Sequence, residues 1–449
     1  MKPSDLRLCE ATLSTQFVPF RTPIKFGGRV MREMLVVDAA VEAETRDGRH
    51  GRGFGSMPLG NVWAWPSAVA SPAETQNVML ALAEEFVRQA NDDRQPGHPL
   101  EITRRLAASH AETSRRVAVS AGLPEAIPPL AQLVAASPLE AAIHDAFGKI
   151  LGRNSFDLLG PEWVNADLAA YLDERFAGEY LERYTLRAPR PTMPLYHLVG
   201  ALDPLSDVDV ASPVGDGLPE TLAEWIAADG LTHLKIKLNG DDLEWDVQRV
   251  LSIERVAAEA QAARGCPDWR YSADFNEKCG SVEYVVEFFA RIGQGSPAAL
   301  RRLQYIEQPM PRDLKAGRGE RVDAAAKIKP VVIDESLVDY ESLLLARELG
   351  YSGVALKACK GQSEALLMAA AAQKFGMFLC VQDLTCPGAS FLHSASLAAR
   401  IPGVAAIEGN GRQYCPATNR GWTERFPTMF RISNGTVGTG ALIGPGLGF

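Results

Sequence analysis

The sequence predicts an α/β protein in which a smaller α+β domain precedes a parallel α/β barrel. Two observations lead to this prediction. Over residues 5–50 apolar and polar side chains alternate, and residues 73–150 carry helical periodicity, which together indicate antiparallel strands packed with helices. After residue 193 short apolar runs alternate with helical runs, a pattern typical of a parallel sheet. Eight such runs in about 220 residues fit a closed barrel better than an open sheet.

Two local signals set boundaries inside the first domain, which is predicted to cover residues 1–192. Residues 51–67 are rich in Gly, Pro and Trp and predict a loop. Ser137 and Pro138 are expected to be the N-cap and first residue of a helix that Gly152 ends.

The second domain, predicted over residues 193–413, is expected to place one strand at each apolar run. Helical segments separate the runs, and residues 313–328 have the weakest helical pattern. No G-x-G-x-x-G motif follows an early strand, which argues against a dinucleotide-binding domain. Residues 414–449 are expected to form a tail that returns to the first domain. The eight runs are MPLYHLVG (193–200), HLKIKL (233–238), WRYSADFN (269–276), LQYIEQP (303–309), VVIDES (331–336), GVALKAC (353–359), MFLCVQD (377–383) and VAAIEGN (404–410).

Composition and charge exclude several classes of partner. The formal net charge is −9, which argues against nucleic acid as a partner. No apolar run reaches the roughly 18 residues that cross a bilayer, and the first residues do not resemble a signal peptide. The seven cysteines form no C-x-x-C pair or metal-binding spacing, so we expect reduced thiols in a cytoplasmic protein.

Three acidic residues end three successive apolar runs. Asp274, Glu307 and Asp334 would therefore lie on neighbouring barrel strands, which are about 4.8 Å apart and bring their ends to one mouth. Clustered carboxylates repel one another and need a cation, and oxygen ligands favour Mg²⁺ over Mn²⁺ or Ca²⁺. The alternative is that each acid caps the helix that follows its own strand.

Lysines occupy comparable positions. Lys235 and Lys237 are two residues apart on one run and so face the same side of it, while Lys357 ends a run about half the barrel away. Such lysines could act on opposite faces of a carbon acid. Burial and nearby positive charge are expected to lower the pKa of a lysine and free its amine to act as a base. The alternative is that Lys235 or Lys237 pairs structurally with a carboxylate.

The combined motifs resemble those of the enolase superfamily, and more closely its mandelate racemase and muconate-lactonizing enzyme branch. They read K-x-K at 235–237, D-x-N at 274–276, E-Q-P at 307–309, D-E-S at 334–336, and then the strand-end Lys357. The resemblance covers nearly the whole chain. It implies a modified TIM barrel, (β/α)7β, with an N-terminal capping domain that the C-terminal tail completes.

The resemblance also implies roles for the strand-end residues. Lys237 would be one acid/base and Lys357 the opposing one, and Lys235 would stabilise the substrate carboxylate or the enolate. The expected cofactor is Mg²⁺, with Mn²⁺ as the alternative. The implied metal ligands are Asp274, Glu307 and Asp334.

Further polar residues are expected around this centre. Asn276 and Glu335 would orient the lysines or the metal ligands, Lys360 is the alternative to Lys357, and Glu335 is the alternative to Asp334. The other candidate contacts are Asp383, Thr385, Glu408 and Asn410, and for Asp383 and Thr385 a helix cap is the alternative.

The implied chemistry is removal of the proton next to a carboxylate to give an enolate. Lysines on both faces suit racemisation, epimerisation or cycloisomerisation; the alternatives are an acid-sugar or hydroxy-acid dehydratase and an o-succinylbenzoate-synthase-like lyase. No histidine ends the sixth or seventh run, which disfavours the branch with a histidine base. Dipeptide epimerases carry Asp-x-Asp where this chain has Glu408-Gly409-Asn410, which disfavours a dipeptide. A metal-binding barrel without turnover and a Schiff-base aldolase are more remote alternatives.

Substrate selection is expected in two segments of the first domain, residues 19–30 and 55–65. They match the positions at which the family closes over its ligand, and their aromatic and cationic residues suit an organic acid with an apolar or cyclic body. The expected partners are this small-molecule carboxylate and further copies of the chain. The candidate lining residues are Arg21, Lys25, Met57, Trp63 and Trp65.

Overall fold

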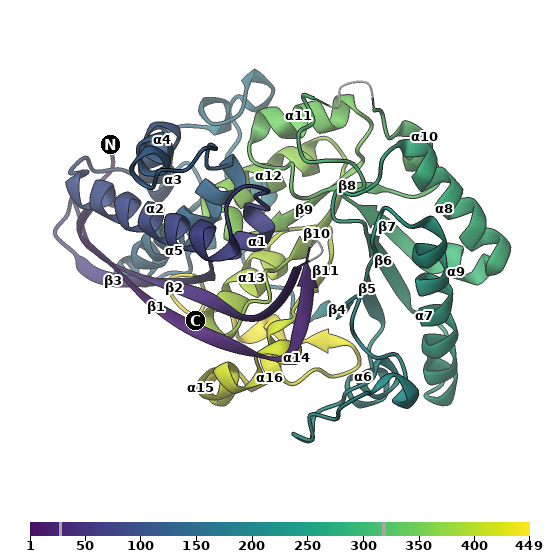
Figure 1. The fold of residues 1–449 in the computed structure, drawn as a ribbon. Helices are drawn as coiled ribbons and strands as arrows, with labels where there is room; N and C mark the ends of the chain where they lie inside the picture. The colour runs from purple at the N-terminus through teal and green to yellow at the C-terminus, as the bar shows by residue number, and fades with distance from the viewer. Residues whose placement is uncertain (27–28, 317–319) are drawn as a thin grey trace.

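The chain folds into a capping domain that lies against a closed barrel (Figure 1). The computed structural model describes residues 1–26, 29–316 and 320–449. The capping domain contains a three-stranded antiparallel sheet, and the barrel contains eight parallel strands. The predicted modified TIM barrel with an N-terminal cap is therefore confirmed. Within the described residues, no helix combines the length and apolar character needed to cross a membrane.

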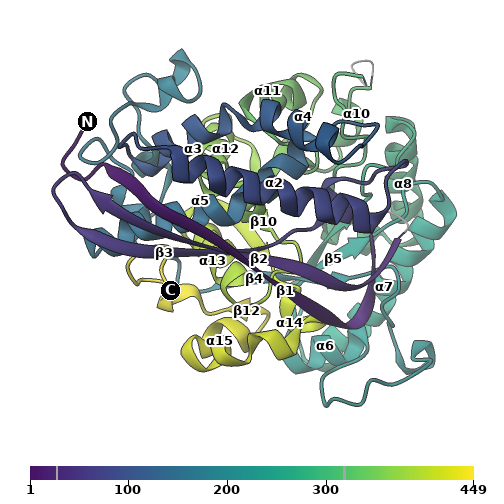
Figure 2. The ribbon, with the colours of Figure 1, turned by 60° about the vertical axis from the view of Figure 1, so that its left-hand side comes forward.

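A long antiparallel hairpin dominates the capping sheet. It is formed by β1 (Leu6–Phe26) and β2 (Arg29–Thr45), and β3 (His50–Pro58) pairs with the other edge of β2. Burial alternates along β2, where Val37, Ala39 and Val41 are buried on the face that meets the helices. Figure 2 shows this hairpin reaching from the capping domain across the barrel. The predicted specificity segment 19–30 also includes Gly27 and Gly28, which lie outside the described residues.

The prediction of a loop over residues 51–67 is wrong, because β3 and the short helix α1 (Asn61–Ala64) occupy most of it. The glycines that suggested a loop serve close packing instead. A Cβ at Gly53 would lie 2.1 Å from the carbonyl oxygen of Ala142, and one at Gly55 would lie 2.1 Å from that of Pro138. Only glycine lets this strand approach the neighbouring helix so closely.

That helix, α5 (Pro129–Leu151), begins earlier than predicted and contains Pro138 in its interior. Proline has no N–H to donate to the carbonyl of Val134, four residues before it. The Ser137 hydroxyl donates to that carbonyl oxygen at 2.9 Å and satisfies it. The predicted end is confirmed, since Gly152 terminates the helix with φ of 64°.

The remaining helices of the capping domain cover the sheet and α5. They are α2 (Pro72–Asp92), α3 (Pro99–Ala107) and α4 (His110–Ser120). Ser71 and Glu74 form a capping box at the start of α2, which explains why that helix begins there.

All eight apolar runs of the second domain form barrel strands. Ile407 of the last strand pairs with Leu195 of the first, which closes the barrel, and β12 (Thr436–Val437) adds an antiparallel pairing to the first strand. The strands are β4 (Met193–Val199), β5 (His233–Lys237), β6 (Arg270–Asp274), β7 (Leu303–Glu307), β8 (Val331–Ile333), β9 (Gly353–Lys357), β10 (Phe378–Gln382) and β11 (Val404–Glu408).

Helices surround the barrel in the expected order. Val285, Phe288 and Ile292 of α8 are buried at helical spacing against the sheet, as an amphipathic helix requires. In residues 313–328, which have the weakest helical pattern, the described part forms only the one-turn helix α10. Residues 317–319 lie outside the described part. The helices are α6 (Leu222–Asp229), α7 (Leu243–Ala263), α8 (Val282–Gly295), α9 (Pro297–Arg302), α10 (Asp323–Ala326), α11 (Tyr340–Glu348), α12 (Gln362–Lys374) and α13 (Gly388–Arg400).

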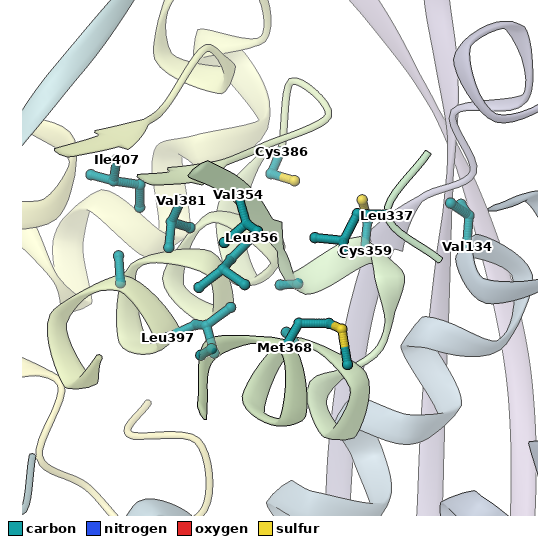
Figure 3. Packing of buried hydrophobic residues seen from close by; sticks show 14 of the residues in the cluster. Val134, Leu337, Val354, Leu356, Cys359, Met368, Val381, Cys386, Leu397 and Ile407 are labelled. Atoms are coloured by element: carbon teal, nitrogen blue, oxygen red, sulfur yellow. The ribbon is translucent and has the colours of Figure 1, made fainter. Parts of the chain in front are cut away.

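Successive side chains of a barrel strand point alternately outward to the helices and inward to the barrel interior. Leu356 of β9 and Val381 of β10 point outward and pack near Met368 of α12 and Leu397 of α13 (Figure 3). Their neighbours along the strand, such as Lys357, point inward. The apolar residues thus fix the helices around the barrel and leave the charged residues facing its interior.

The C-terminal segment runs back to the capping domain. It contains the short helices α14 (Gly411–Tyr414), α15 (Arg420–Arg425) and α16 (Pro427–Phe430). Its last residues meet the end of α5, where the backbone N–H of Leu447 donates to Asp145 Oδ1 at 3.0 Å.

A buried contact between α5 and α12 joins the two domains. The N-cap of α12, Gly361, has no side chain, and the carboxylate of Glu140 accepts from the Ser363 N–H at 3.2 Å instead. His144 Nε2 lies 2.8 Å from the Ser363 hydroxyl. Burial raises the pKa of Glu140 to about 7.

This contact makes the stability of the protein depend on pH. Because the folded pKa of Glu140 lies above its unfolded value, its stabilising protonation is present at acidic pH and is lost as the pH rises through about 7. Glu140→Gln stays neutral at every pH. The difference in free energy of unfolding between Glu140→Gln and wild type should therefore shift by ~2–3 kcal/mol in favour of the variant when the pH is raised from 5 to 8. Urea unfolding at both pH values measures this, and a pH-independent difference would contradict it.

Candidate active site

Charged side chains from most barrel strands meet at the carboxyl end of the barrel. The parallel register pairs Lys237 with Asp274 and Asp274 with Glu307, so these three lie side by side on adjacent strands. Asp334 follows β8 directly, and Lys357, Gln382 and Glu408 end β9, β10 and β11. All of these residues are buried.

Lys235 is the centre of this group. Its ammonium donates to Glu307 Oε1 at 3.0 Å, to Gln382 Oε1 at 3.0 Å and to Glu408 Oε2 at 3.1 Å. Asp274 Oδ2 lies 3.2 Å away and is also paired with Lys237. A single buried ammonium thus neutralises parts of three carboxylates.

A second cluster forms around Asp334. Lys357 lies 2.9 Å from its Oδ2 and Lys360 lies 3.1 Å from its Oδ1. Lys360 also donates to the backbone carbonyl of Asp334 at 2.5 Å. Both lysines that the sequence offers for this position therefore contact Asp334.

The expectation that burial lowers the lysine pKa values is wrong for Lys235 and Lys357. Burial does act to lower both values. For Lys235 the carboxylates of Glu307, Glu408 and Asp274 outweigh it, and for Lys357 that of Asp334 does, so that both pKa values lie above the ordinary one. The physical reason is that the lysines are buried together with carboxylates and not among apolar groups.

Among the three expected metal ligands, Glu307 shows the effect of like charge, whereas, against the effect of burial, the neighbouring lysines lower the pKa values of Asp274 and Asp334. Burial together with the nearby Asp274 and Asp334 raises the pKa of Glu307 well above its usual value. In the described residues, no three acidic, histidine or cysteine side chains lie close enough to hold an ion as they stand. Ammonium groups stand between them: Lys235 bridges Asp274 and Glu307.

The capping domain closes one side of the mouth with Trp63. Its indole Nε1 donates to Glu335 Oε1 at 2.9 Å, and its ring centre lies 4.3 Å from Lys357 Nζ. Arg312 fixes the backbone of this segment, donating to the carbonyl oxygens of Trp63 at 3.0 Å and Ala64 at 3.1 Å. Glu335 thus faces the capping domain, and burial beside Asp334 raises its pKa to about 7.

The other residues of the two capping segments lie in different places. Arg21 forms an ion pair with Asp216 at 2.6 Å, and Lys25 lines a cavity with Lys237. Met57 is buried, and its sulfur lies 3.7 Å from that of Cys386. Trp65 is buried and donates to Glu125 at 3.0 Å inside the capping domain.

The remaining expected polar residues mostly hold backbone groups. Asp383 accepts from the N–H groups of Thr385, Cys386 and Asn410, and so orders the turn before α13. The side chain of Asn410 donates to Glu408 at 2.6 Å. Asn276 contributes its backbone N–H, which donates to Asp274 Oδ1 at 2.9 Å.

Two glutamines were missed by the sequence analysis. Gln382 bridges Lys235 and Glu307, and the inward parity of its run was the signal that could have found it. Gln308 of the E-Q-P motif accepts from the backbone N–H of Asp334 at 2.9 Å and donates to Ser336 at 2.8 Å. Both are buried; Gln382 holds the carboxylate of Glu307, and Gln308 holds the backbone that carries Asp334.

Comparison with known proteins places this geometry among characterised folds. A family model described as enolase C-terminal domain-like matches residues 217–449. An aromatic dipeptide epimerase from Herpetosiphon aurantiacus is 28% identical over 211 residues, which are 46% of this chain and 54% of that protein. The match thus spans about half the length of that curated relative.

Solved structures share the whole architecture at low sequence identity. The L-Ala-D/L-Glu epimerase from Bacillus subtilis aligns with a TM-score of 0.64 and 16% identity over 98% of both chains. An enolase from Bradyrhizobium, in complex with magnesium and mandelic acid, aligns with a TM-score of 0.62 and 15% identity over 99% of this chain and 96% of that chain. At these identities the similarity shows the fold alone.

The position of Trp63 gives a prediction about access to Lys357. Trp63→Leu removes the ring and should increase acetylation of Lys357 and Lys360 by acetic anhydride, but not that of Lys235, which is 1% exposed. It should also destabilise the fold by about 2–4 kcal/mol, because a cation–π contact and a hydrogen bond are lost. Peptide mass spectrometry measures the acetylation.

Trp65→Leu is the matched control, since Trp65 is buried nearby but contacts Glu125 within the capping domain. It should leave the acetylation pattern at the mouth unchanged. Equal acetylation of Lys357 in wild type and Trp63→Leu would show that the indole does not cover it.

Proposed function

The chain belongs to the enolase C-terminal domain-like family, and from this premise we propose that it is a Mg²⁺-dependent enzyme that removes the α-proton of a carboxylate substrate. The product class is that of a racemase, an epimerase or a cycloisomerase. The enolate formed by proton removal is the intermediate common to these reactions.

One observation carries the proposal: the positions of Lys237 and Lys357 around the barrel. They end β5 and β9, which are separated by three strands on either side and therefore lie opposite each other. Asp274, Glu307 and Asp334 end or follow the three intervening strands on one side. A substrate held at these carboxylates would present one face to each lysine.

The donor set fits the proposed metal in chemistry. Asp274, Glu307 and Asp334 would hold it through carboxylate oxygens, the ligands that hard divalent cations prefer. The bound ion would offset the charge that develops on the substrate carboxylate. The raised pKa of Glu307 reflects the same mutual repulsion that a cation relieves.

The lysines carry out the proton transfers. With a cation held at the carboxylates that now keep Lys357 protonated, one amine would accept the α-proton while the electron pair of the C–H bond moves toward the carboxylate as the enolate forms. The ammonium of the opposing lysine then donates a proton to the other face, which inverts the centre. Lys235, held by three acceptors, contributes a fixed positive charge beside the developing anion.

The arrangement at the end of β11 argues against a dipeptide as substrate. Glu408 contacts Lys235 and Asn410, one through each carboxylate oxygen. An ammonium group of a substrate would have to displace these contacts. The similarity to an aromatic dipeptide epimerase therefore supports the reaction class more than the substrate.

The two-lysine arrangement predicts stereospecific defects. In D₂O with MgCl₂, wild type should exchange the α-proton of both enantiomers of its substrate, found by screening racemic α-substituted carboxylates. Lys237→Ala should lose exchange of one enantiomer and Lys357→Ala that of the other, each by about 10²–10⁴-fold. Proton NMR of the separate enantiomers measures this.

Lys327→Gln is the control, because Lys327 is exposed at the end of α10, remote from the strand ends that form the mouth. It should exchange both enantiomers like wild type. If Lys237→Ala and Lys357→Ala lose the same enantiomer, the opposing arrangement is not the one used.

The carboxylates give a prediction that does not depend on turnover. Saturating Mg²⁺ should raise the free energy of unfolding of wild type by about 2.7 kcal/mol at one hundred times its dissociation constant. Glu307→Gln should largely abolish this increase. Denaturant unfolding with MgCl₂ or with EDTA tests it, and an equal response of both proteins would remove Glu307 from the proposed ligand set.

A further inference from the structure

A cavity of about 250 Å³ opens at the barrel mouth beside Lys237. It lies between the tip region of the capping hairpin and the loops that follow β4, β5 and β6. Its polar lining residues are Lys25, Lys237, Asn239, Asp241, Asn276 and Lys278. Because Lys237 also faces Asp274, the cavity adjoins the proposed reaction centre.

The charges around this cavity are not balanced. Of the three lysines that line it, Lys237 is paired with Asp274, and the other two, Lys25 and Lys278, face a single lining carboxylate, that of the exposed Asp241. Among the described residues, neither Lys25 nor Lys278 has an ion pair or a side-chain hydrogen bond. By contrast, the carboxylates deeper in the mouth already contact Lys235, Lys237, Lys357 and Lys360. The two rim lysines are therefore not needed to neutralise the interior.

The loop after β6 brings Lys278 to the cavity through an unusual turn. Asn276 and Glu277 have φ of 47° and 65°, a conformation that costs energy for residues other than glycine. Arg312 holds the turn, donating to Glu277 Oε2 at 2.7 Å. The loop after β5 packs tightly against it, since a Cβ at Gly240 would lie 2.7 Å from the Cβ of Lys278. The backbone position of Lys278 is thus fixed, although its side chain is exposed.

We propose that this cavity binds a second anionic group of the substrate. The inference rests on the proposed function for the first carboxylate, and it narrows the substrate to a dicarboxylate or a carboxylate that carries another oxyanion, such as a phosphonate. Lys25 and Lys278 would contact the second group, and Asn239 and Asn276 offer amide donors beside it. The α-carbon would then lie next to Lys237, between the two anionic groups.

Calorimetric titration in the presence of MgCl₂ tests this without turnover. The probes are the dicarboxylates from malonate to adipate, the monocarboxylates of equal carbon number, and 3-phosphonopropionate. At least one dianionic probe should bind wild type about ten-fold more tightly than its monocarboxylate, the effect of two ion pairs at a partly exposed site. The preference should weaken as NaCl is raised. Comparison of the dicarboxylates with the phosphonate shows which oxyanion is preferred.

The double variant Lys25→Gln/Lys278→Gln should lose this preference, and Lys327→Gln, the matched exposed lysine, should keep it. Circular dichroism confirms that each variant is folded. A preference that is absent from wild type, or that survives in the double variant, would overturn the inference. Because binding is measured directly, a wild type that prefers dianions but exchanges no α-proton would contradict the proposed reaction and leave this site in place.

Discussion

The mutual neutralisation of buried charges at the barrel mouth is the constraint on which the rest of the site depends. Lys235, Asp274 and Glu307 are 1% exposed or less, and an unpaired charge at that depth is severely destabilising. Each strand can place a charge there only because its neighbours place the opposite charge within about 3 Å. Removing Lys235 alone would take away the ammonium that Glu307 and Glu408 share, while Asp274 would keep its pairing with Lys237, so Lys235 is as much a structural element as a chemical one.

The capping domain completes the mouth through contacts of different kinds. Trp63 covers Lys357 with its ring, Arg312 holds the backbone that carries this indole, and Glu140 accepts from the start of α12. The last contact lies behind the turn that carries Lys360, so the position of α5 and the position of that lysine are linked. A displacement of the capping domain would therefore change the positions of Lys357 and Lys360 more than that of Lys235.

The sequence was a good guide where one periodicity determined the outcome. The eight barrel strands were predicted because short apolar runs, as expected for strands buried on both faces, alternate with helical runs. The glycines of β3 were misread because their purpose, close approach to α5, depends on a partner far away in the chain. Pro138 was misread because Ser137 compensates the missing backbone donor. The direction of the lysine pKa shifts could not be predicted from the spacing alone, since it depends on how many carboxylates share one ammonium.

The lysines at the rim of the mouth, Lys25 and Lys278, would have to attract an anionic ligand to a protein whose overall charge is negative. The chain carries a formal net charge of −9, which by itself would repel an anionic substrate. At physiological ionic strength, however, charges are screened beyond roughly 8 Å, so an approaching ligand responds mainly to the nearest side chains. At the cavity beside Lys237 these are Lys25 of the hairpin and Lys278 of the loop after β6, against the single carboxylate of Asp241, while Lys237 is paired with Asp274. The local excess of lysine therefore decides the sign of the field that a ligand meets as it enters, and the acidic remainder of the surface has little influence there.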